Sequence, residues 1–192
     1  MVDEALIAWG RAMAARRRRT FPPLWLFTDL ARLADPRSAV ARLPKGLAGV
    51  VFRHDGAPAR QALGHDLARL CRARRLALVV AGDPRLAASL GAGLHIRRGR
   101  LMLTRRRSGL LTASAHDRAE LVRAARAGAD LVFLGPAFAT ASHPVVRPLG
   151  AVRWNRLARA APVPVASLGG ITGRRVRALP AAAAAGAIGA LA

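Results

Sequence analysis

The sequence predicts a single α/β domain folded as a (β/α)8 barrel, or TIM barrel, with an extra N-terminal helix and a missing or shortened last helix. Short apolar runs alternate with helical segments along the chain, as strands buried on both faces do. An open doubly wound sheet is the competing fold, but no glycine fingerprint follows the first strand. The eight expected strands are 24–28, 47–52, 76–81, 93–96, 110–113, 131–134, 163–168 and 187–191.

The chain is expected to divide into an N-terminal helix, residues 1–20, and a barrel domain, residues 21–192. Leu6, Trp9 and Met13 recur at helical spacing in the first part. We expect this helix to close the bottom of the barrel or to contact a second subunit in a homodimer. Further helices are expected at 36–42, 57–74, 84–90, 117–127, 151–159 and 174–184.

The formal net charge of +22 is by itself a weak sign of nucleic-acid binding. Lys45 is the one lysine among 32 basic residues, and the arginines are spread over most of the expected helices. Stacking on bases needs aromatic side chains among the arginines, and the chain holds three Trp, five Phe and no Tyr. Solvated surface arginine is therefore favoured over a polyanion site, and nucleic acid is not expected as a partner.

Cys71 is the single cysteine, which excludes an internal disulfide. No uninterrupted apolar run reaches the roughly 18 residues of a membrane span, so no membrane partner is expected. The first residues are acidic and a basic run follows them, the reverse of a secretory signal. These features lead us to expect a cytoplasmic protein.

The reacting groups of a (β/α)8 barrel lie on the loops that follow the strands, which selects two candidate catalytic residues. His116 follows the fifth strand and His143 the sixth, and either imidazole could move a proton near neutral pH. The alternative for His116 is a hydrogen-bonded residue before a helix, where Asp117 and Glu120 form a capping-box pattern. His95 is interpreted as a satisfied histidine of the barrel interior.

Glycines near the last two strands are candidates for binding a phosphate group. Gly169-Gly170 closes the seventh strand and Gly189 lies in the expected eighth. Loops at this place bind anions through backbone N–H groups in many barrels. The alternative is that the paired glycine only permits a tight turn.

Two charged residues also fall on the same rim. Arg53 follows the second strand and is a candidate for binding substrate. Asp83 follows the third strand and is either a metal or pyrophosphate-site carboxylate or the cap of the helix that Pro84 opens.

Three motifs resemble a known family. They are Gly135-Pro136-Ala137-Phe138-Ala139-Thr140, Leu168-Gly169-Gly170-Ile171 and Ser114-Ala115-His116. From Leu24 onward the chain resembles the thiamine-phosphate synthase and TenI superfamily, small (β/α)8 barrels of thiamine biosynthesis. The resemblance implies that Gly169, Gly170 and the strand-eight glycine hold the phosphate of a thiazole phosphate, with Thr140 and Ser142 nearby.

The resemblance implies two different reactions. Synthases join a pyrimidine methyl pyrophosphate to a thiazole phosphate with Mg²⁺, and Asp83 falls on one of their magnesium-ligand positions. Arg100 stands where their second carboxylate would be. TenI-type members need no metal and aromatise a thiazole phosphate carboxylate tautomer by a proton shift, using a histidine that His116 matches.

We therefore expect a TenI-like thiazole tautomerase with no required cofactor. The first alternative is thiamine-phosphate synthase, with Mg²⁺ as its cofactor. The second is a non-catalytic barrel that binds a phosphorylated ligand or has a regulatory role.

Overall fold

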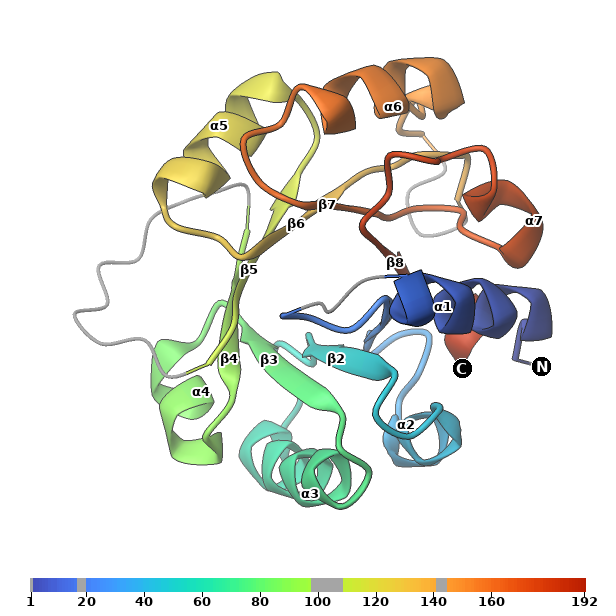
Figure 1. Ribbon diagram of the computed structural model, residues 1–192. Helices are drawn as coiled ribbons and strands as arrows, with labels where there is room; N and C mark the ends of the chain where they lie inside the picture. Colours follow the sequence, from blue (N-terminus) through green and yellow to red (C-terminus); the bar gives the residue numbers. More distant parts are fainter. Residues whose placement is uncertain (1, 17–19, 98–108, 141–144) are drawn as a thin grey trace.

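The computed structural model is a closed barrel of eight parallel strands, in which each strand pairs with the next and β8 pairs with β1 (Figure 1). The structure describes residues 2–16, 20–97, 109–140 and 145–192. The (β/α)8 fold expected from the sequence is confirmed. The strands are β1 (Leu24–Phe27), β2 (Ala48–Phe52), β3 (Ala77–Ala81), β4 (Gly93–Ile96), β5 (Leu111–Ala115), β6 (Leu131–Leu134), β7 (Val165–Ser167) and β8 (Ala184–Ala187).

Large aromatic side chains from β1 and β6 fill the barrel interior. The rings of Trp25 and Phe27 pack edge-on against Phe133, with ring centroids 5.6 Å and 4.8 Å apart. Glycines lie opposite these rings: a Cβ at Gly49 would lie 2.6 Å from the Trp25 ring, and one at Gly186 would lie 2.9 Å from Phe27. The rings therefore decide which positions of the neighbouring strands must lack a side chain.

A ring of helices surrounds the strands (Figure 1). A second cluster of apolar side chains lies between the strands and these helices. Alternate strand residues, such as Val50 and Phe52 of β2, belong to this cluster together with helix residues such as Leu67 and Trp154. The helices are α1 (Glu4–Arg16), α2 (Arg37–Arg42), α3 (Arg60–Ala73), α4 (Pro84–Leu90), α5 (Arg118–Arg126), α6 (Gly150–Arg159) and α7 (Gly173–Val176), and the 3₁₀ helix η1 (Gly189–Leu191) follows β8.

Helix α1 lies in this outer ring, between α7 and α2 (Figure 1). Gly10 lets α1 approach β1 closely, because a Cβ there would lie 2.6 Å from the side chain of Leu24. The backbone N–H of Asp3 donates to the carbonyl of Ala190 at 2.9 Å, so the helix begins at the carboxyl end of β8. The helix takes the ring position that comes after α7 and does not close the bottom of the barrel.

The expected boundaries of the last two elements are wrong. We expected a helix at 174–184 and a strand at 187–191, but α7 ends at Val176 and β8 runs from Ala184 to Ala187. Ala-Ala-Gly-Ala has low strand propensity, and the sequence pattern favoured the more apolar residues after it. Small residues are required there because Gly186 faces the rings of Phe27 and Phe133. Gly189 consequently lies beyond the strand, in η1.

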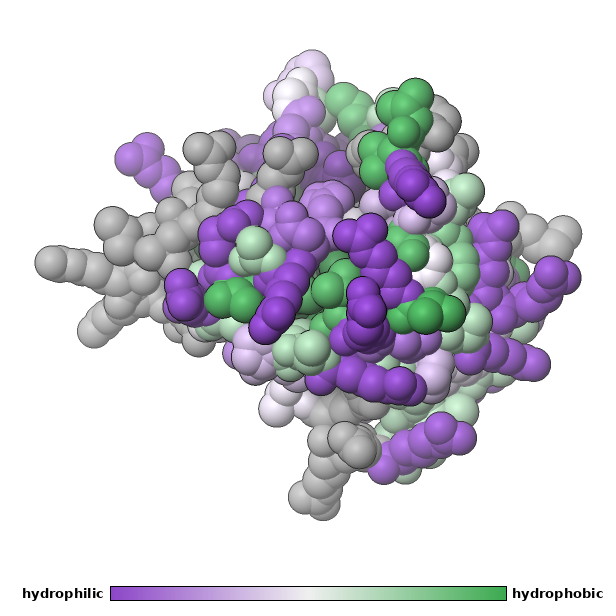
Figure 2. Space-filling model, turned by 90° about the horizontal axis from the view of Figure 1, so that it is seen from above, coloured by the Kyte–Doolittle hydropathy of each residue, from purple (hydrophilic) through white to green (hydrophobic). Residues whose placement is uncertain are grey.

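Arginine side chains cover much of the surface, as the composition led us to expect. Helices α5 and α6 carry exposed arginines. On the face that Figure 2 shows, hydrophilic side chains predominate and apolar groups lie between them. Val152 of α6 is among the exposed apolar residues. Within the described residues, no helix has both the length and the apolar character needed to cross a membrane.

The ring cluster generates a prediction about stability. Gly186→Ala should destabilise the fold by about 1–3 kcal/mol, because the new Cβ overpacks against Phe27 and Phe133. Gly189→Ala is the control, since a Cβ there meets no heavy atom within 4 Å. The free energy of unfolding from urea denaturation measures both, and equal values for the two variants would contradict the steric account.

Candidate active site

A pocket of about 660 Å³ opens at the carboxyl ends of the strands. The rings of Phe27 and Phe133 are part of its lining, so the top of the aromatic cluster is also the floor of the pocket. Six of the predicted site residues line it: Arg53, His116, Thr140, Gly169, Gly170 and Gly189.

Three predicted residues are not placed in this lining. Ser142 and His143 lie outside the described residues. Asp83 is described but does not line the pocket.

The loop after β7 is packed against the loop after β6. The N–H of Ala137 donates to the carbonyl of Leu168 at 2.8 Å, and the N–H of Phe138 to that of Gly169 at 3.1 Å. Gly169 and Gly170 have φ of +89° and +63°, and a Cβ at Gly170 would collide with the carbonyl oxygen of Ala139. The tight turn that the sequence left as one alternative is therefore real, and it accounts for both glycines.

The same turn leaves backbone donors facing the pocket. Gly169, Gly170 and Ile171 line the pocket, and among the described residues their N–H groups have no hydrogen-bond acceptor. Buried or partly buried N–H groups normally find a partner. An anionic ligand is a suitable partner, so the turn is compatible with the phosphate alternative as well.

Three arginines contribute positive charge to the pocket: Arg32, Arg53 and Arg175. Burial lowers the pKa of Arg53, and the nearby Asp29 carboxylate opposes this effect. Arg175 donates from Nη1 to the carbonyl of Gly170 at 3.1 Å, and its guanidinium lies 5.6 Å from the centre of the Phe138 ring. No sequence motif pointed to Arg32 or Arg175, although Arg175 lies in the first turn after the glycine loop.

Asp3 also lines the pocket and was not expected there. Its Oδ2 accepts the N–H of Gly173 at 2.8 Å, and its Oδ1 accepts the N–H of Leu6 at 3.0 Å. Together with the bond from its own N–H to Ala190, Asp3 links the start of α1 to the loops after β7 and β8. No local sequence pattern could reveal that Asp3 lies at the pocket, because Gly173 is 170 residues away from it in the chain.

His116 lies at the edge of the pocket and is half exposed. Its Nδ1 lies 2.9 Å from Oε2 of Glu120, and its backbone N–H donates to the same oxygen at 2.8 Å. Asp117 caps α5 as expected, but the carboxylate of Glu120 bonds to His116 and not to the N–H of Asp117. The carboxylate fixes the orientation of the imidazole, and Nε2 has no hydrogen-bond partner among the described residues.

Arg53 is positioned by a buried histidine. His54 is fully buried, and its Nε2 lies 3.0 Å from the carbonyl of Leu33. A carbonyl can only accept, so Nε2 carries the proton and Nδ1 accepts from the hydroxyl of Thr28 at 2.9 Å. That hydroxyl oxygen in turn accepts the N–H of Arg53 at 2.9 Å. The chain of bonds joins the loops after β1 and β2.

His95 is a satisfied interior histidine, as expected. Its ring nitrogens lie 2.9 Å from the hydroxyl of Thr112 and 3.2 Å from that of Ser114. Burial, and to a lesser degree the charge of Arg53, lowers the pKa of His95 to about 3, so the imidazole is neutral. Ser114 lines the pocket, and His95 thus orients a hydroxyl group at the pocket wall.

The surroundings of Asp83 do not fit a magnesium site. Its Oδ1 caps α4 by accepting the N–H of Leu86 at 2.9 Å, and its Oδ2 accepts from Nη1 of Arg60 at 2.8 Å. These two partners, the backbone N–H first, hold the pKa of Asp83 below its usual range. Arg60 also pairs with Asp55 at 3.3 Å. Within the described residues no three His, Cys, Asp or Glu side chains gather to hold a metal. The capping alternative is the one that the structure supports.

The closed parallel barrel with a pocket at the carboxyl ends of its strands defines a (β/α)8-barrel protein, and comparison with known proteins identifies the family. The family model described as thiamine monophosphate synthase matches residues 28–190, and the chain belongs to this family. The resemblance inferred from the sequence motifs is confirmed.

Curated relatives share about a third of their aligned residues with this chain. The thiamine biosynthesis bifunctional protein ThiED of Geobacter sulfurreducens is 32% identical over 78% of this chain and 32% of that protein. The thiamine-phosphate synthase of Chromobacterium violaceum is 37% identical over 55% of this chain and 56% of that protein. The thiamine-phosphate synthase of Chloroflexus aurantiacus is 31% identical over 77% of this chain and 74% of that protein. The match thus spans about a third of the first relative and about half of the second.

A solved structure supports the fold. The thiamine phosphate pyrophosphorylase from Pyrococcus furiosus superposes with a TM-score of 0.70 over 86% of this chain and 84% of that one, at 21% identity.

The buried state of His95 leads to a prediction about pH. An unfolded histidine titrates near 6.5, and His95 in the folded protein titrates at about 3. Between these pH values the unfolded state binds a proton that the folded state does not, so the free energy of unfolding falls as the pH falls. His95→Gln should reduce this slope, measured by urea denaturation from pH 7 to 4. His65→Gln, which changes an exposed histidine of α3, should keep it. Parallel curves for His95→Gln and the unaltered protein would contradict the prediction.

The pairing of Asp83 generates a prediction about Mg²⁺. Isothermal titration of the ligand-free protein with MgCl₂ should show no micromolar binding, because both carboxylate oxygens already have partners. Titration with Mg²⁺ and pyrophosphate together is the control, since the pyrophosphate oxygens can supply ligands. Micromolar binding of Mg²⁺ alone that disappears in Asp83→Asn would contradict this conclusion.

Proposed function

We propose that this protein acts in thiamine biosynthesis as a thiamine-phosphate synthase, joining a pyrimidine methyl pyrophosphate to a thiazole phosphate in the rim pocket. The names of its relatives support this reaction better than the tautomerase reaction that we expected from the sequence. The structural observation that supports the proposal is that the N–H groups of Gly169, Gly170 and Ile171 have no acceptor within the described part of the chain. They line a pocket that also holds arginine side chains.

In the proposed complex the phosphate of the thiazole lies against the loop after β7, with Gly189 and Thr140 close by. Backbone N–H groups and a guanidinium are strong donors to phosphate oxygens. The heterocyclic ring lies over the apolar floor of Phe27, Phe133 and Leu168, which line the same pocket.

The proposed reaction breaks one C–O bond and forms one C–N bond. The thiazole nitrogen bonds to the methylene carbon of the pyrimidine, and the pyrophosphate leaves with the electron pair of the broken bond. The leaving group carries increasing negative charge, and Arg53 is a half-buried cation in the pocket lining that could stabilise it. His54 and Thr28 hold Arg53 in position through its backbone N–H. Mg²⁺, where the reaction uses it, would enter with the pyrophosphate.

The tautomerase reaction is the second candidate, and two observations favour it. The carboxylate of Asp83 accepts hydrogen bonds from Arg60 and from the first turn of α4, which is expected of a site that works without a resident metal. His116 is held by Glu120 at the pocket edge, as a proton-transferring imidazole would be.

Two assays on the purified protein separate the candidates. Pyrimidine methyl pyrophosphate and thiazole phosphate, with and without Mg²⁺, should give thiamine phosphate, which chromatography detects. The thiazole phosphate carboxylate tautomer tests the second reaction by the ultraviolet absorbance of its aromatic product. Aromatisation without condensation would establish the tautomerase, and calorimetric binding of thiazole phosphate without either reaction would leave a non-catalytic binding protein.

Variation at His116 distinguishes the two mechanisms. His116→Ala should slow any tautomer aromatisation by about 10²- to 10⁴-fold, the usual effect of losing a general acid–base group. Condensation should change less than tenfold, because it needs no proton shift on the ring. His65→Ala is the matched control on the exposed face of α3. Unchanged aromatisation in His116→Ala would move the role to His143, to be tested by the equivalent change.

A further inference from the structure

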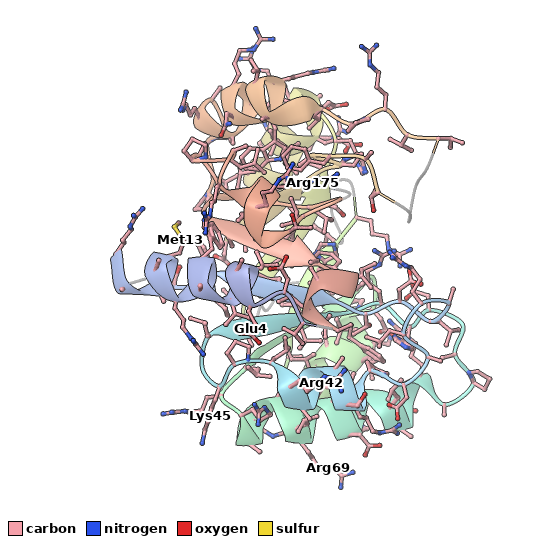
Figure 3. All side chains as sticks on the ribbon, turned by 90° about the vertical axis from the view of Figure 1, so that its right-hand side faces the viewer. Glu4, Met13, Arg42, Lys45, Arg69 and Arg175 are labelled. Carbon is pink, nitrogen blue, oxygen red and sulfur yellow. The ribbon has the colours of Figure 1, made fainter. Side chains whose placement is uncertain are left out.

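We propose that Arg175 selects the phosphorylated form of the ligand over the unphosphorylated form. This inference rests on the proposed function for the identity of the ligand, but not for the identity of the group that Arg175 binds. The residue extends from α7, above α1 in Figure 3, and it lines the pocket.

Arg175 is fixed next to the unpaired backbone donors. Its Nη1 donates to the carbonyl of Gly170 at 3.1 Å. Gly170 belongs to the loop whose N–H groups find no acceptor in the described ranges. Its own N–H donates to the hydroxyl of the N-cap residue Thr172 at 3.2 Å. Side-chain and backbone contacts thus hold the same residue against the loop after β7.

The aromatic ring of Phe138 holds the other side of the guanidinium, with 5.6 Å between the guanidinium carbon and the ring centre. A cation over a ring at this distance is attracted to its face. Among the described residues, Nε and Nη2 of Arg175 have no hydrogen-bond partner. The side chain is therefore held in place with donors left over, and a planar fork of donors matches two oxygens of a phosphate.

The charges around Arg175 suit a dianion. Arg53 lines the same pocket, and Asp3 is the one acidic residue among the described lining residues. Asp3 uses its oxygens on the N–H groups of Gly173 and Leu6 and makes no hydrogen bond with Arg175. An unphosphorylated thiazole alcohol offers Arg175 no charge, so the guanidinium discriminates between the two forms of the ligand.

The experiment measures the binding of thiazole phosphate and of the thiazole alcohol to the unaltered protein and to variants of Arg175. Arg175→Met keeps a long apolar stem over Phe138 and removes the charge. It should raise the Kd of thiazole phosphate by about 10- to 100-fold, as expected for losing hydrogen bonds between charged groups. It should leave the Kd of the thiazole alcohol within twofold. Arg175→Lys keeps the charge but not the fork of donors, so its Kd for thiazole phosphate should lie between those of the unaltered protein and of Arg175→Met. It replaces Arg175→Met as the test if that variant does not fold.

Arg174→Met is the matched control, because Arg174 is the neighbour of Arg175 on α7, is exposed like it, and is not among the pocket-lining residues. It should leave both dissociation constants unchanged. An equal loss for the phosphorylated and unphosphorylated ligands in Arg175→Met would show a structural role, and no loss for either would show no role. Either result overturns the proposal.

Inorganic phosphate separates this inference from the proposed function. If phosphate binds the unaltered protein and binds more weakly to Arg175→Met, while thiazole phosphate binds neither, Arg175 is a phosphate-binding residue and the proposed function is wrong. If the synthase reaction proceeds and phosphate binding does not depend on Arg175, the function stands and this inference fails.

Discussion

The packing of three aromatic rings inside the barrel is the constraint on which the rest of the structure depends. Trp25, Phe27 and Phe133 fill the space that other barrels fill with layers of branched side chains. Their size excludes side chains at Gly49 and Gly186, so β2 and β8 can approach closely enough to close the sheet. The pocket begins where the rings end, because Phe27 and Phe133 are also part of its lining. Closure of the barrel and depth of the site are thus set by the same side chains.

Above the rings, the site depends on loops that hold one another. Backbone hydrogen bonds join the loop after β6 to the loop after β7, and Asp3 joins the loops after β7 and β8 to the start of α1. Beside β8 in the closed barrel, His54 joins the loops after β1 and β2. Most of these contacts use backbone groups, so the loops are oriented before any ligand arrives. Such preorganisation lowers the entropy that binding must overcome.

Periodicity predicted the parts of the fold in which local pattern and tertiary packing agree. β4 and β6 begin and end at the predicted residues because their apolar runs are bounded by loops on both sides. The prediction failed at β8, where Ala-Ala-Gly-Ala is a poor strand sequence by propensity and is required by the rings across the barrel. The rim residues were predicted from topology, and the structure places Arg53 and His116 in the pocket lining. Asp3 and Arg175 were missed because their roles depend on contacts that no short motif records.

The positive charge of the chain is divided between two parts of the rim. Arg60 is bound to Asp55 and Asp83, and Arg97 is also paired with Asp55, so these two cations are neutralised within the protein. In the pocket, no carboxylate is hydrogen-bonded to the guanidinium of Arg53 or Arg175 within the described part of the chain. An anionic ligand is attracted where charge is left unneutralised and partly shielded from water. Arg53 and Arg175 are therefore the pocket cations available to an anionic ligand. Arg60 instead joins the loops after β2 and β3, where Asp83 was expected to bind a metal.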